Sequence, residues 1–335
     1  MADSTLAAIR TKVRRLTRSP STAQISDSTI DEYVSTFFLY DFPEHLRLFS
    51  LRETFSFYTQ PNIDTYETTT AVSTDPLFNF KNKYITVHTP IYIEGYESYF
   101  SMDRTSFFRI YPIVAQEQQI NQTGDGVTTL FTGTLPNTPV LPGTILFSAI
   151  TAANVAMTYI DNFQSSILGN LVIPNQTAPV AGTINYVTGA YSITFSSAPA
   201  MGQNITCETF SYQPSRPNAL LYFDDKFVVR PVPDKAYKIQ MEVYKRPITL
   251  GNDPTLSPEL EQWWQYIAYG AAKKIFEDRM DLESVQLILP EYKKQEMLVQ
   301  RRTIVQQTEQ RSATIYTDNT AGAYGSGWFN GGGNF

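Results

Sequence analysis

The amino-acid sequence predicts an α+β protein in which an all-β domain interrupts a mixed domain. The first observation is an abrupt loss of charge, because Asp161 is the only charged residue from Gly126 to Cys207. The second is a set of apolar stripes with helical spacing near both ends of the chain. A chain of 335 residues also exceeds the usual size of a single-core domain. We therefore expect three parts: a discontinuous α+β core, an inserted β-domain and a C-terminal arm, which cover residues 1–118 with 213–310, 119–212 and 311–335 respectively.

Two helices are predicted at the start of the core. An apolar stripe with steps of three and four residues predicts a helix over residues 4–18. The stripe consists of Leu6, Ile9, Val13 and Leu16. Ser28 and Asp31 have the spacing of a capping box, which predicts a second helix over residues 28–40. Residues 46–118 are then rich in segments typical of strands, namely FSFYT, YITVHTPIYI and FFRIYPIV.

The insert has the pattern of an all-β domain. Six of its segments are rich in Val, Ile, Thr and aromatic residues, and Gly, Pro and Asn separate them. The segments are VTTLFTG, TILFSAI, NLVIP, GTINYV, AYSITFSSAP and NITCETFSY. Gly124-Asp125-Gly126 and Thr188-Gly189 predict tight hairpin turns, because glycine readily adopts a positive φ. The pattern predicts a sandwich of six to eight strands.

The C-terminal third returns to helix after two further strands in LLYFDDKFVVRPVP and YKIQMEVYKRPITL. Ser257 as N-cap before Pro258 predicts a helix over residues 257–279. Its expected buried face comprises Leu260, Trp263, Trp264, Ile267, Ala271 and Ile275. Another helix is predicted over residues 283–310, broken or kinked at Pro290. We expect these helices to pack with the two N-terminal helices, since each apolar stripe needs a partner.

Composition excludes several classes of protein. The net charge of −6 argues against a dedicated nucleic-acid binder, which normally has a basic bias. A single cysteine allows no intrachain disulfide. The N-terminal stretch lacks the apolar centre of a signal peptide, and no run approaches the ~20 apolar residues of a membrane span. We expect a protein without a membrane partner.

Residues that could perform catalysis or bind a metal are scarce, and we predict no enzyme, no cofactor and no metal site. His45 and His88 have no neighbouring residue at ligand spacing. Cys207 lies in a strand pattern and fits a small core residue. Asp224-Asp225 fits a turn between two strands, whereas a hard cation needs several converging oxygens.

Two segments are candidates for contact with partners. The N-terminal helix carries five cations within nine residues, namely Arg10, Lys12, Arg14, Arg15 and Arg18. They could contact an acidic protein surface or DNA phosphates, or they could form a solvated helix face. The arm is rich in Gly and Asn and carries aromatic residues that could anchor on a portal or a neighbouring subunit, namely Tyr316, Tyr324, Trp328, Phe329 and Phe335. It is either a loose end or a segment that orders on a partner.

Three stretches together resemble head-to-tail adaptor (connector) proteins of short-tailed bacteriophages. They are IRTKVRRLTRSPSTAQISDSTIDEYVSTFFLYDFPEHLRLF, LSPELEQWWQYIAYGAAKKIFEDR and, as a β-module of phage virion proteins, GTINYVTGAYSITFSSAPAMGQNITCETFSY. The resemblance implies a structural virion protein that forms a dodecameric ring docked on the portal protein at the head–tail junction. It also implies tail-tube or nozzle proteins as further partners, a channel through which genomic DNA passes without sequence specificity, and synthesis in the host bacterial cytoplasm. The large insert departs from the smallest adaptors.

The physical properties of the chain agree with such an assembly. A low-charge insert cannot rely on charge repulsion for solubility and is favoured by packing against neighbours. An acidic channel would let DNA pass without sticking. One alternative is another virion component, such as a tail-tube, baseplate or receptor-binding protein. A virion-associated glycan hydrolase is a weaker alternative, because it needs paired carboxylates and the insert offers only Asp161.

Overall fold

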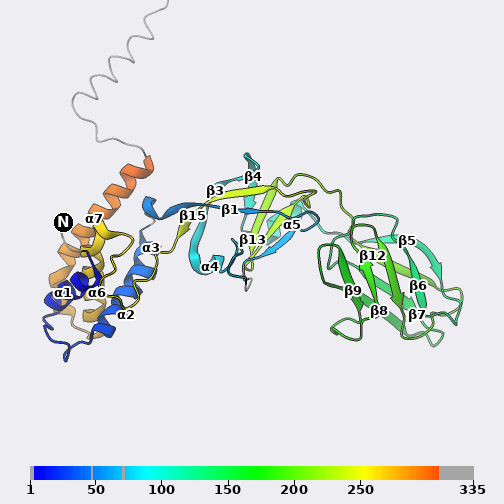
Figure 1. Cartoon of the computed structure of the whole chain (residues 1–335), viewed down its shortest axis with the longest axis horizontal. Helices are drawn as coiled ribbons and strands as arrows, with labels where there is room; N and C mark the ends of the chain where they lie inside the picture. The colour runs from blue at the N-terminus through cyan, green and yellow to red at the C-terminus, as the bar shows by residue number, and fades with distance from the viewer. Residues whose placement is uncertain (1–3, 47, 70–71, 309–335) are drawn as a thin grey trace, which may run out of the picture. The chain divides into compact units, whose positions relative to one another are not determined.

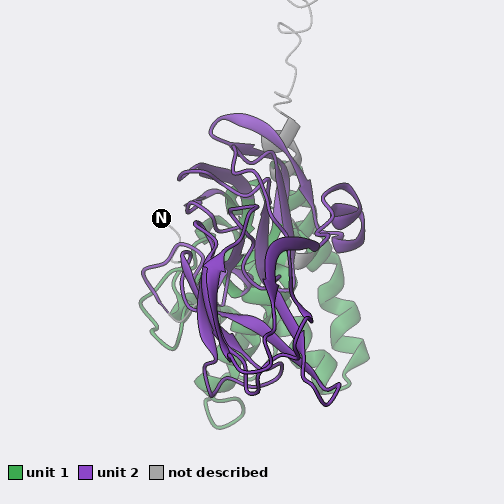
Figure 2. Cartoon of the chain, turned by 90° about the vertical axis from the view of Figure 1, so that its right-hand side faces the viewer, with its two compact units in different colours: residues 1–53, 82–86, 243–335 green, residues 54–81, 87–242 purple. Residues whose placement is uncertain are grey.

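The computed structural model describes residues 4–46, 48–69 and 72–308 (Figure 1). It contains helices and two β-sheets, so the predicted α+β class is confirmed. The chain divides into two compact units (Figure 2). The helical unit comprises residues 1–53, 82–86 and 243–335, and the β unit comprises residues 54–81 and 87–242.

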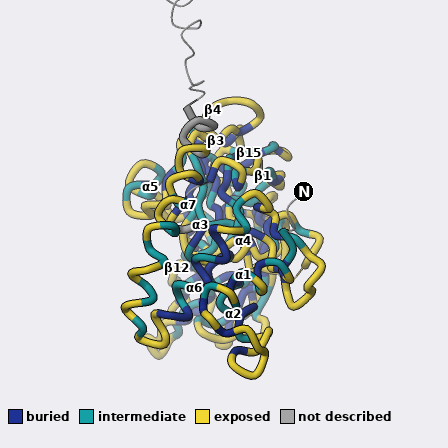
Figure 3. The backbone as a smooth tube through the Cα atoms, turned by 90° about the vertical axis from the view of Figure 1, so that its left-hand side faces the viewer, coloured by how far each residue is buried: buried dark blue, intermediate teal, exposed yellow. Residues whose placement is uncertain are grey.

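The helical unit is built from segments at the two ends of the chain. Its elements are α1 (Leu6–Leu16), α2 (Asp27–Thr36), the π-helical turn η1 (Phe37–Asp41), α3 (Phe42–His45), the 3-10 turns η2 (Phe49–Leu51) and η3 (Glu261–Trp263), α6 (Trp264–Asp278) and α7 (Leu282–Thr308). One hydrophobic cluster takes side chains from α1, α2, η1, α6 and α7, among them Ile9, Val34, Phe38, Ile267 and Val299. Buried and exposed stretches therefore alternate along these helices (Figure 3).

The second helix differs from its prediction at both ends. It begins at Asp27, and its N-cap is Ser26, whose hydroxyl accepts a hydrogen bond from the backbone N–H of Thr29. The predicted capping box fails because the carboxylate of Asp31 binds Arg10 instead of a backbone N–H. The helical path continues beyond residue 40 through η1 and α3 to His45.

The predicted start of the helix at Ser257 is wrong. The carbonyls of Pro254 and Leu256 accept hydrogen bonds from the first turn of α1, so this stretch stays irregular and caps another helix. Residues 261–263 form the 3-10 turn η3, and α6 begins only at Trp264. Trp264 is only partly buried, whereas Tyr266 is 1% exposed. The expected buried face is therefore wrong at Trp264, and the fully buried side chain is that of Tyr266, two residues later.

The last helix, α7, runs without a break through Pro290. A proline inside a helix removes one backbone hydrogen bond and typically costs ~3 kcal/mol. Here Pro290 is exposed, and Tyr292 and Val299 pack the opposite side of α7 into the core. That packing anchors the part of α7 that follows the proline.

The seven-stranded sheet has the strand order β1-β15-β3-β4-β13-β14-β2. Its strands are β1 (Arg52–Tyr58), β2 (Thr65–Glu67), β3 (Tyr84–Ile93), β4 (Tyr96–Ser101), β13 (Ala219–Phe223), β14 (Lys226–Arg230) and β15 (Lys238–Lys245), with the short helices α4 (Phe80–Lys83) and α5 (Arg104–Ile110) between them. The predicted turn at Asp224-Asp225 is confirmed, since both residues have a positive φ and join the paired strands β13 and β14. The expected strand FFRIYPIV is wrong, because α5 occupies its first half. Asp103 caps that helix by accepting from the N–H of Thr105.

The eight-stranded sheet has the order β5-β12-β7-β8-β9-β10-β11-β6 and is barrel-like, where the sequence predicted a sandwich. Its strands are β5 (Gln116–Thr123), β6 (Leu130–Thr134), β7 (Leu146–Ile150), β8 (Ala156–Phe163), β9 (Leu168–Val172), β10 (Gly182–Asn185), β11 (Ala190–Thr194) and β12 (Asn204–Thr209). The amide of Gln122 in the edge strand β5 donates to the carbonyl of Thr132 in the other edge strand, β6, over 2.8 Å. The two edges therefore meet, as in a barrel.

The two predicted hairpin turns have different outcomes. Gly189 has φ +73° and ends the turn between the paired strands β10 and β11. The segment from Gly124 to Gly126 joins β5 to β6, which meet at the edges of the sheet without backbone pairing in the described strand order, so the predicted hairpin is not formed. The N–H of Gly124 instead donates to the carbonyl of Gln203 over 2.8 Å.

The eight-stranded sheet has a hydrophobic cluster of its own, which includes Phe147, Tyr186 and Phe195. It begins at Gln116, close to the predicted boundary, and it belongs to the same compact unit as the seven-stranded sheet. Independent folding of residues 119–212 stays a prediction.

Candidate functional site

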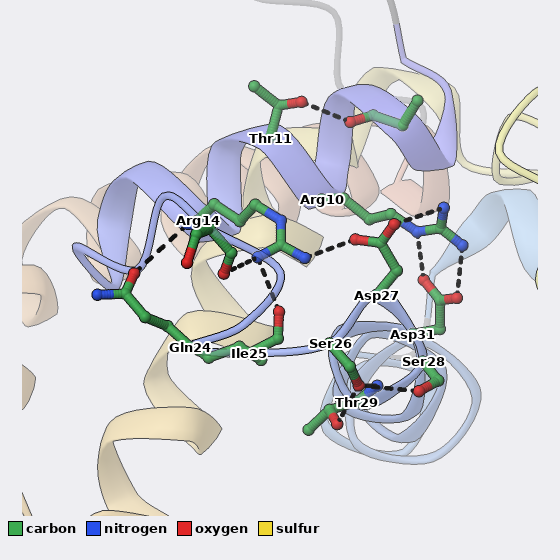
Figure 4. A network of polar contacts seen from close by, with 12 residues as sticks. Arg10, Thr11, Arg14, Gln24, Ile25, Ser26, Asp27, Ser28, Thr29 and Asp31 are labelled. Carbon is green, nitrogen blue, oxygen red and sulfur yellow. Dashed lines mark hydrogen bonds and ion pairs between the residues drawn. The ribbon is translucent and has the colours of Figure 1, made fainter.

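Arg10 of the basic N-terminal helix is held inside the helical unit. Its Nε and Nη2 donate to the two carboxylate oxygens of Asp31 over 2.7 and 2.5 Å, a bidentate pair between α1 and α2 (Figure 4). Nη2 also lies 3.3 Å from the carbonyl of Asn252. Asp31 is buried, and its hydrogen bond raises the pKa of Arg10 above its ordinary value. Arg10 is therefore a cross-link between helices.

Arg14 has the same kind of role one turn later. Its guanidinium donates to the carbonyls of Ser21 and Ile25 and to the carboxylate of Asp27, over 3.0, 2.8 and 2.5 Å (Figure 4). The hydrogen bond from Arg14 lowers the pKa of Asp27, with a further contribution from the charge of Arg10. Arg14 thereby fastens the loop before α2 to α1.

The other three cations of this group lie differently. Lys12 lies over the ring of Tyr269 in α6, with 5.2 Å from Nζ to the ring centroid. Arg15 and Arg18 are exposed. The structure thus does not bring the five cations together into one open patch, and contact with a partner could involve Arg15 and Arg18.

The outer face of α7 is a candidate site that the sequence reasoning missed. On this face Leu287 is 67% exposed, Met297 61% and Leu298 48%. At 100° per residue, these three side chains fall on the side of α7 opposite to Tyr292 and Val299, which pack into the core. Leu282, the first residue of α7, and Met280 before the helix are also exposed. The signal was present in the sequence, because apolar residues occur on both sides of this helix instead of in one stripe.

Basic side chains accompany this apolar face. Lys294 and Arg301 fall on the same side of α7, and Lys293 and Arg302 are also exposed. An exposed helix face that combines apolar residues with cations is typical of a surface that contacts another protein. We call the set Leu287, Lys294, Met297, Leu298 and Arg301 the α7 outer face.

A groove of 400 Å³ lies within the helical unit between η1, α3, α6 and α7. Most of its charged residues are paired: Asp41 lies 2.6 Å from Lys274, and Lys273 lies 3.1 Å from Glu277, while His45 shares a hydrogen bond of 2.5 Å with Glu296. Tyr266 and Tyr292 share a hydrogen bond between their hydroxyls in the same groove. Burial raises the pKa of Tyr266, so this hydroxyl stays protonated. The contacts of Lys274 with Asp41 and of His45 with Glu296 connect separate helical segments, whereas Lys273 and Glu277 both lie in α6.

No protein-family model matches this sequence, and no curated protein matches it. The candidate site therefore depends on the geometry alone.

The remaining residues considered from the sequence lie apart from the α7 outer face. Cys207 is buried in the core of the eight-stranded sheet, and burial raises its pKa to about 12, so it is unsuited to nucleophilic chemistry. His88 lies in the seven-stranded sheet, 3.9 Å from Glu242. Asp225 pairs with Lys81 at 3.0 Å. Within residues 4–46, 48–69 and 72–308, three or more His, Cys, Asp or Glu side chains nowhere gather as metal ligands would.

The aromatic residues of the predicted arm lie outside the described residues, namely Tyr316, Tyr324, Trp328, Phe329 and Phe335. Among the helices that the structure does describe, we find none with both the length and the apolar character of a membrane span.

Proposed function

We propose that this chain is a structural subunit of a tailed-phage particle, and that it forms the head-to-tail adaptor ring beneath the portal. In this role, copies of the helical unit stand side by side around a channel for the genome. The resemblance of the N-terminal and C-terminal stretches to phage adaptors gives the proposal its direction. The α7 outer face is the observation that carries it.

The α7 outer face suits contact between copies. The inner side of α7 is already occupied by the core, so its outer apolar side chains can gain burial from another molecule. In a closed ring each subunit presents one surface to the next subunit and a different surface to the previous one. A helix face with both apolar side chains and cations can supply one of these two surfaces.

The pairing of charges in the helical unit also supports a structural role. In the groove, Asp41 is paired with Lys274 and Glu277 with Lys273, at 2.6 and 3.1 Å, and Glu296 lies 2.5 Å from the imidazole of His45. A hydrolase would need a pair of carboxylates that face a substrate. The ion pairs of the groove therefore favour a subunit of an assembly over an enzyme.

The arm from residue 311 onward belongs to the same proposal as the segment that reaches the portal. Truncation after Gln310 should leave the thermal unfolding of the subunit unchanged and abolish its capture by portal rings. Capture at full strength by the truncated chain would contradict this part of the proposal.

Sedimentation velocity with single substitutions tests the role of the α7 outer face. Leu287→Glu or Met297→Glu should weaken self-association by at least about tenfold, because a charge replaces an apolar contact at an interface. Gln300→Glu is the matched control, since it adds the same charge to an exposed position of α7 outside the face. Equal association of all four proteins, wild type included, would contradict the proposal, as would an equal loss in the Gln300 variant.

A further inference from the structure

A small pocket in the β unit lies where three segments of the chain meet. It measures 220 Å³, and its lining includes Arg230 at the end of β14, Phe210 and Tyr212 after β12, and Tyr111 and Pro112 after α5. Rings form most of this wall. The pocket is therefore narrow, largely apolar and built around one cation.

Arg230 is unusual because it is buried without a full set of hydrogen bonds. The residue is 5% exposed, and its Nη1 lies 2.7 Å from Oδ2 of Asp64, without the alignment of a hydrogen bond. Nε and Nη2 make no hydrogen bond to any residue in the described part of the chain. Buried guanidinium groups normally use these N–H donors, and leaving them unused is costly. Arg230 is thus the charged residue in the lining of the pocket, and its unused donors lie buried behind that lining.

The neighbouring phenols are engaged elsewhere. The hydroxyl of Tyr212 donates to Oδ1 of Asn62, and that of Tyr111 donates to Oδ1 of Asn218, each over 3.1 Å. Burial raises the pKa of Tyr212, with a further contribution from Asp64, so this phenol remains neutral. The two tyrosines accordingly contribute ring surface and no negative charge to the pocket.

We propose that this pocket binds a carboxylate carried by a small flat apolar group, with Nε and Nη2 of Arg230 as its bidentate donors. A carboxylate matches the side-on edge of a guanidinium in spacing and plane. Asp64 already balances the charge of Arg230, so a singly charged ligand fits better than a phosphate dianion. The aromatic and proline walls suit a flat hydrocarbon group, and the volume accommodates one ring. The carboxylate belongs either to a free acid or to the C-terminus of a polypeptide, and the site does not depend on the adaptor role.

Titration calorimetry of the full chain with benzoate tests the site, with benzamide as the neutral isostere. Benzoate should bind, and benzamide should bind at least about tenfold more weakly, because hydrogen bonds between two charged groups are stronger than those to a neutral amide. Arg230→Gln should lower the affinity for benzoate by a similar factor. Asp64→Asn should bind benzoate more tightly than the wild type, because it removes the competing carboxylate while the backbone carbonyl of residue 64 still accepts from Val229.

The thermal unfolding of each variant shows whether it is folded. If Arg230→Gln does not fold, the comparison of benzoate with benzamide and the gain in Asp64→Asn still decide the matter. N-acetyl-glycyl-phenylalanine, titrated in parallel, distinguishes the two sources of the carboxylate. Tighter binding of this peptide supports a polypeptide C-terminus, and tighter binding of benzoate supports a free acid. The proposal is overturned if neither benzoate nor the peptide binds. It is also overturned if Arg230→Gln binds benzoate like the wild type, or if Asp64→Asn binds benzoate more weakly than the wild type.

Discussion

The helical unit and the eight-stranded sheet differ in what their charged side chains do. In the helical unit, pairs such as Arg10 with Asp31 and Lys274 with Asp41 connect one helix to another. In the eight-stranded sheet, Asp161 is buried and accepts hydrogen bonds from the N–H groups of Gly143 and Ile145 and from the hydroxyl of Tyr186.

Backbone geometry explains this difference. A helix satisfies its own backbone, so separate helices need side chains to hold them in place. Strands hold each other through backbone hydrogen bonds, so the eight-stranded sheet needs few charges, and the carboxylates of Asp161 and Asp125 fasten loops. Low charge in the insert is thus compatible with a well-ordered fold, and many charged side chains of the helices form pairs that stabilise the fold.

The largest expected effect concerns the core of the helical unit. Tyr266→Ala should lower the free energy of unfolding by ~3–5 kcal/mol, because Tyr266 is fully buried and packs against Phe37 and Phe42. Trp264→Ala is the control from the same helix and should cost clearly less, since Trp264 is only partly buried. Urea unfolding followed by far-ultraviolet circular dichroism measures both. A larger loss for Trp264 than for Tyr266 would show that the order of burial is wrong.

The next effect concerns the buried carboxylate of the eight-stranded sheet. Asp161→Ala should cost about 3 kcal/mol, because three donors lose their acceptor and each buried unsatisfied donor costs ~1–3 kcal/mol. Calorimetry of the full chain should show this loss in the transition of the β unit. Glu117→Ala, which removes an exposed carboxylate from β5 of the same sheet, should change that transition less. Equal shifts for the two variants would refute the special role of Asp161.

A double-mutant cycle on Arg10 and Asp31 addresses the cross-link between α1 and α2. Because Asp31 is buried and Arg10 is nearly so, Asp31→Ala should cost about 2–3 kcal/mol, somewhat below the range for fully buried pairs. The coupling energy should account for most of this loss. Arg15→Ala, at an exposed position of the same helix, should stay within about 0.5 kcal/mol of the wild type. A coupling energy near zero would mean that Arg10 does not hold the helices together.

The smallest effect is a pH dependence at Asp27. Its pKa is lowered in the folded protein, below an ordinary value of 3.8, so the unfolded chain binds more protons in the acidic range. The contribution of Asp27 is present above that value and is lost as the pH falls through the folded pKa. Since the side chain is 49% exposed, the effect should stay below ~1 kcal/mol. Asp27→Asn should therefore differ from the wild type at neutral pH and approach it in acid. A difference that is the same at both pH values would contradict this origin.

The sequence was informative where a pattern acts locally. Three residues of the predicted stripe, Leu6, Ile9 and Val13, are buried, and the fourth, Leu16, is partly buried. The Asp224-Asp225 turn joins two paired strands. The low-charge segment contains most of the eight-stranded sheet. In each case the spacing of residues in a short window determines which side chains are buried or which turn forms.

Other features depended on contacts that are distant in sequence. Ser257 looks like an N-cap, but the residues just before it cap α1 instead, and the helix starts at Trp264. The strand β8 contains Asp161, a residue type that is rare in strands. Its buried hydrogen bonds, which the sequence does not show, explain its presence there. In the sequence, Arg10 and Arg14 look like part of a basic surface for a partner. In the structure, they form ion pairs with Asp31 and Asp27 of the same chain. A single sequence does not show which distant group will satisfy a charge or a backbone N–H.

The central claim is that copies of this chain form a closed ring on a portal. Negative-stain electron microscopy of the purified chain, alone and mixed with portal rings of the same phage, tests it most directly. The account predicts closed rings with a central hole, stacked coaxially on one end of the portal. Single particles of monomer size, or open filaments that leave the portal bare, would contradict it.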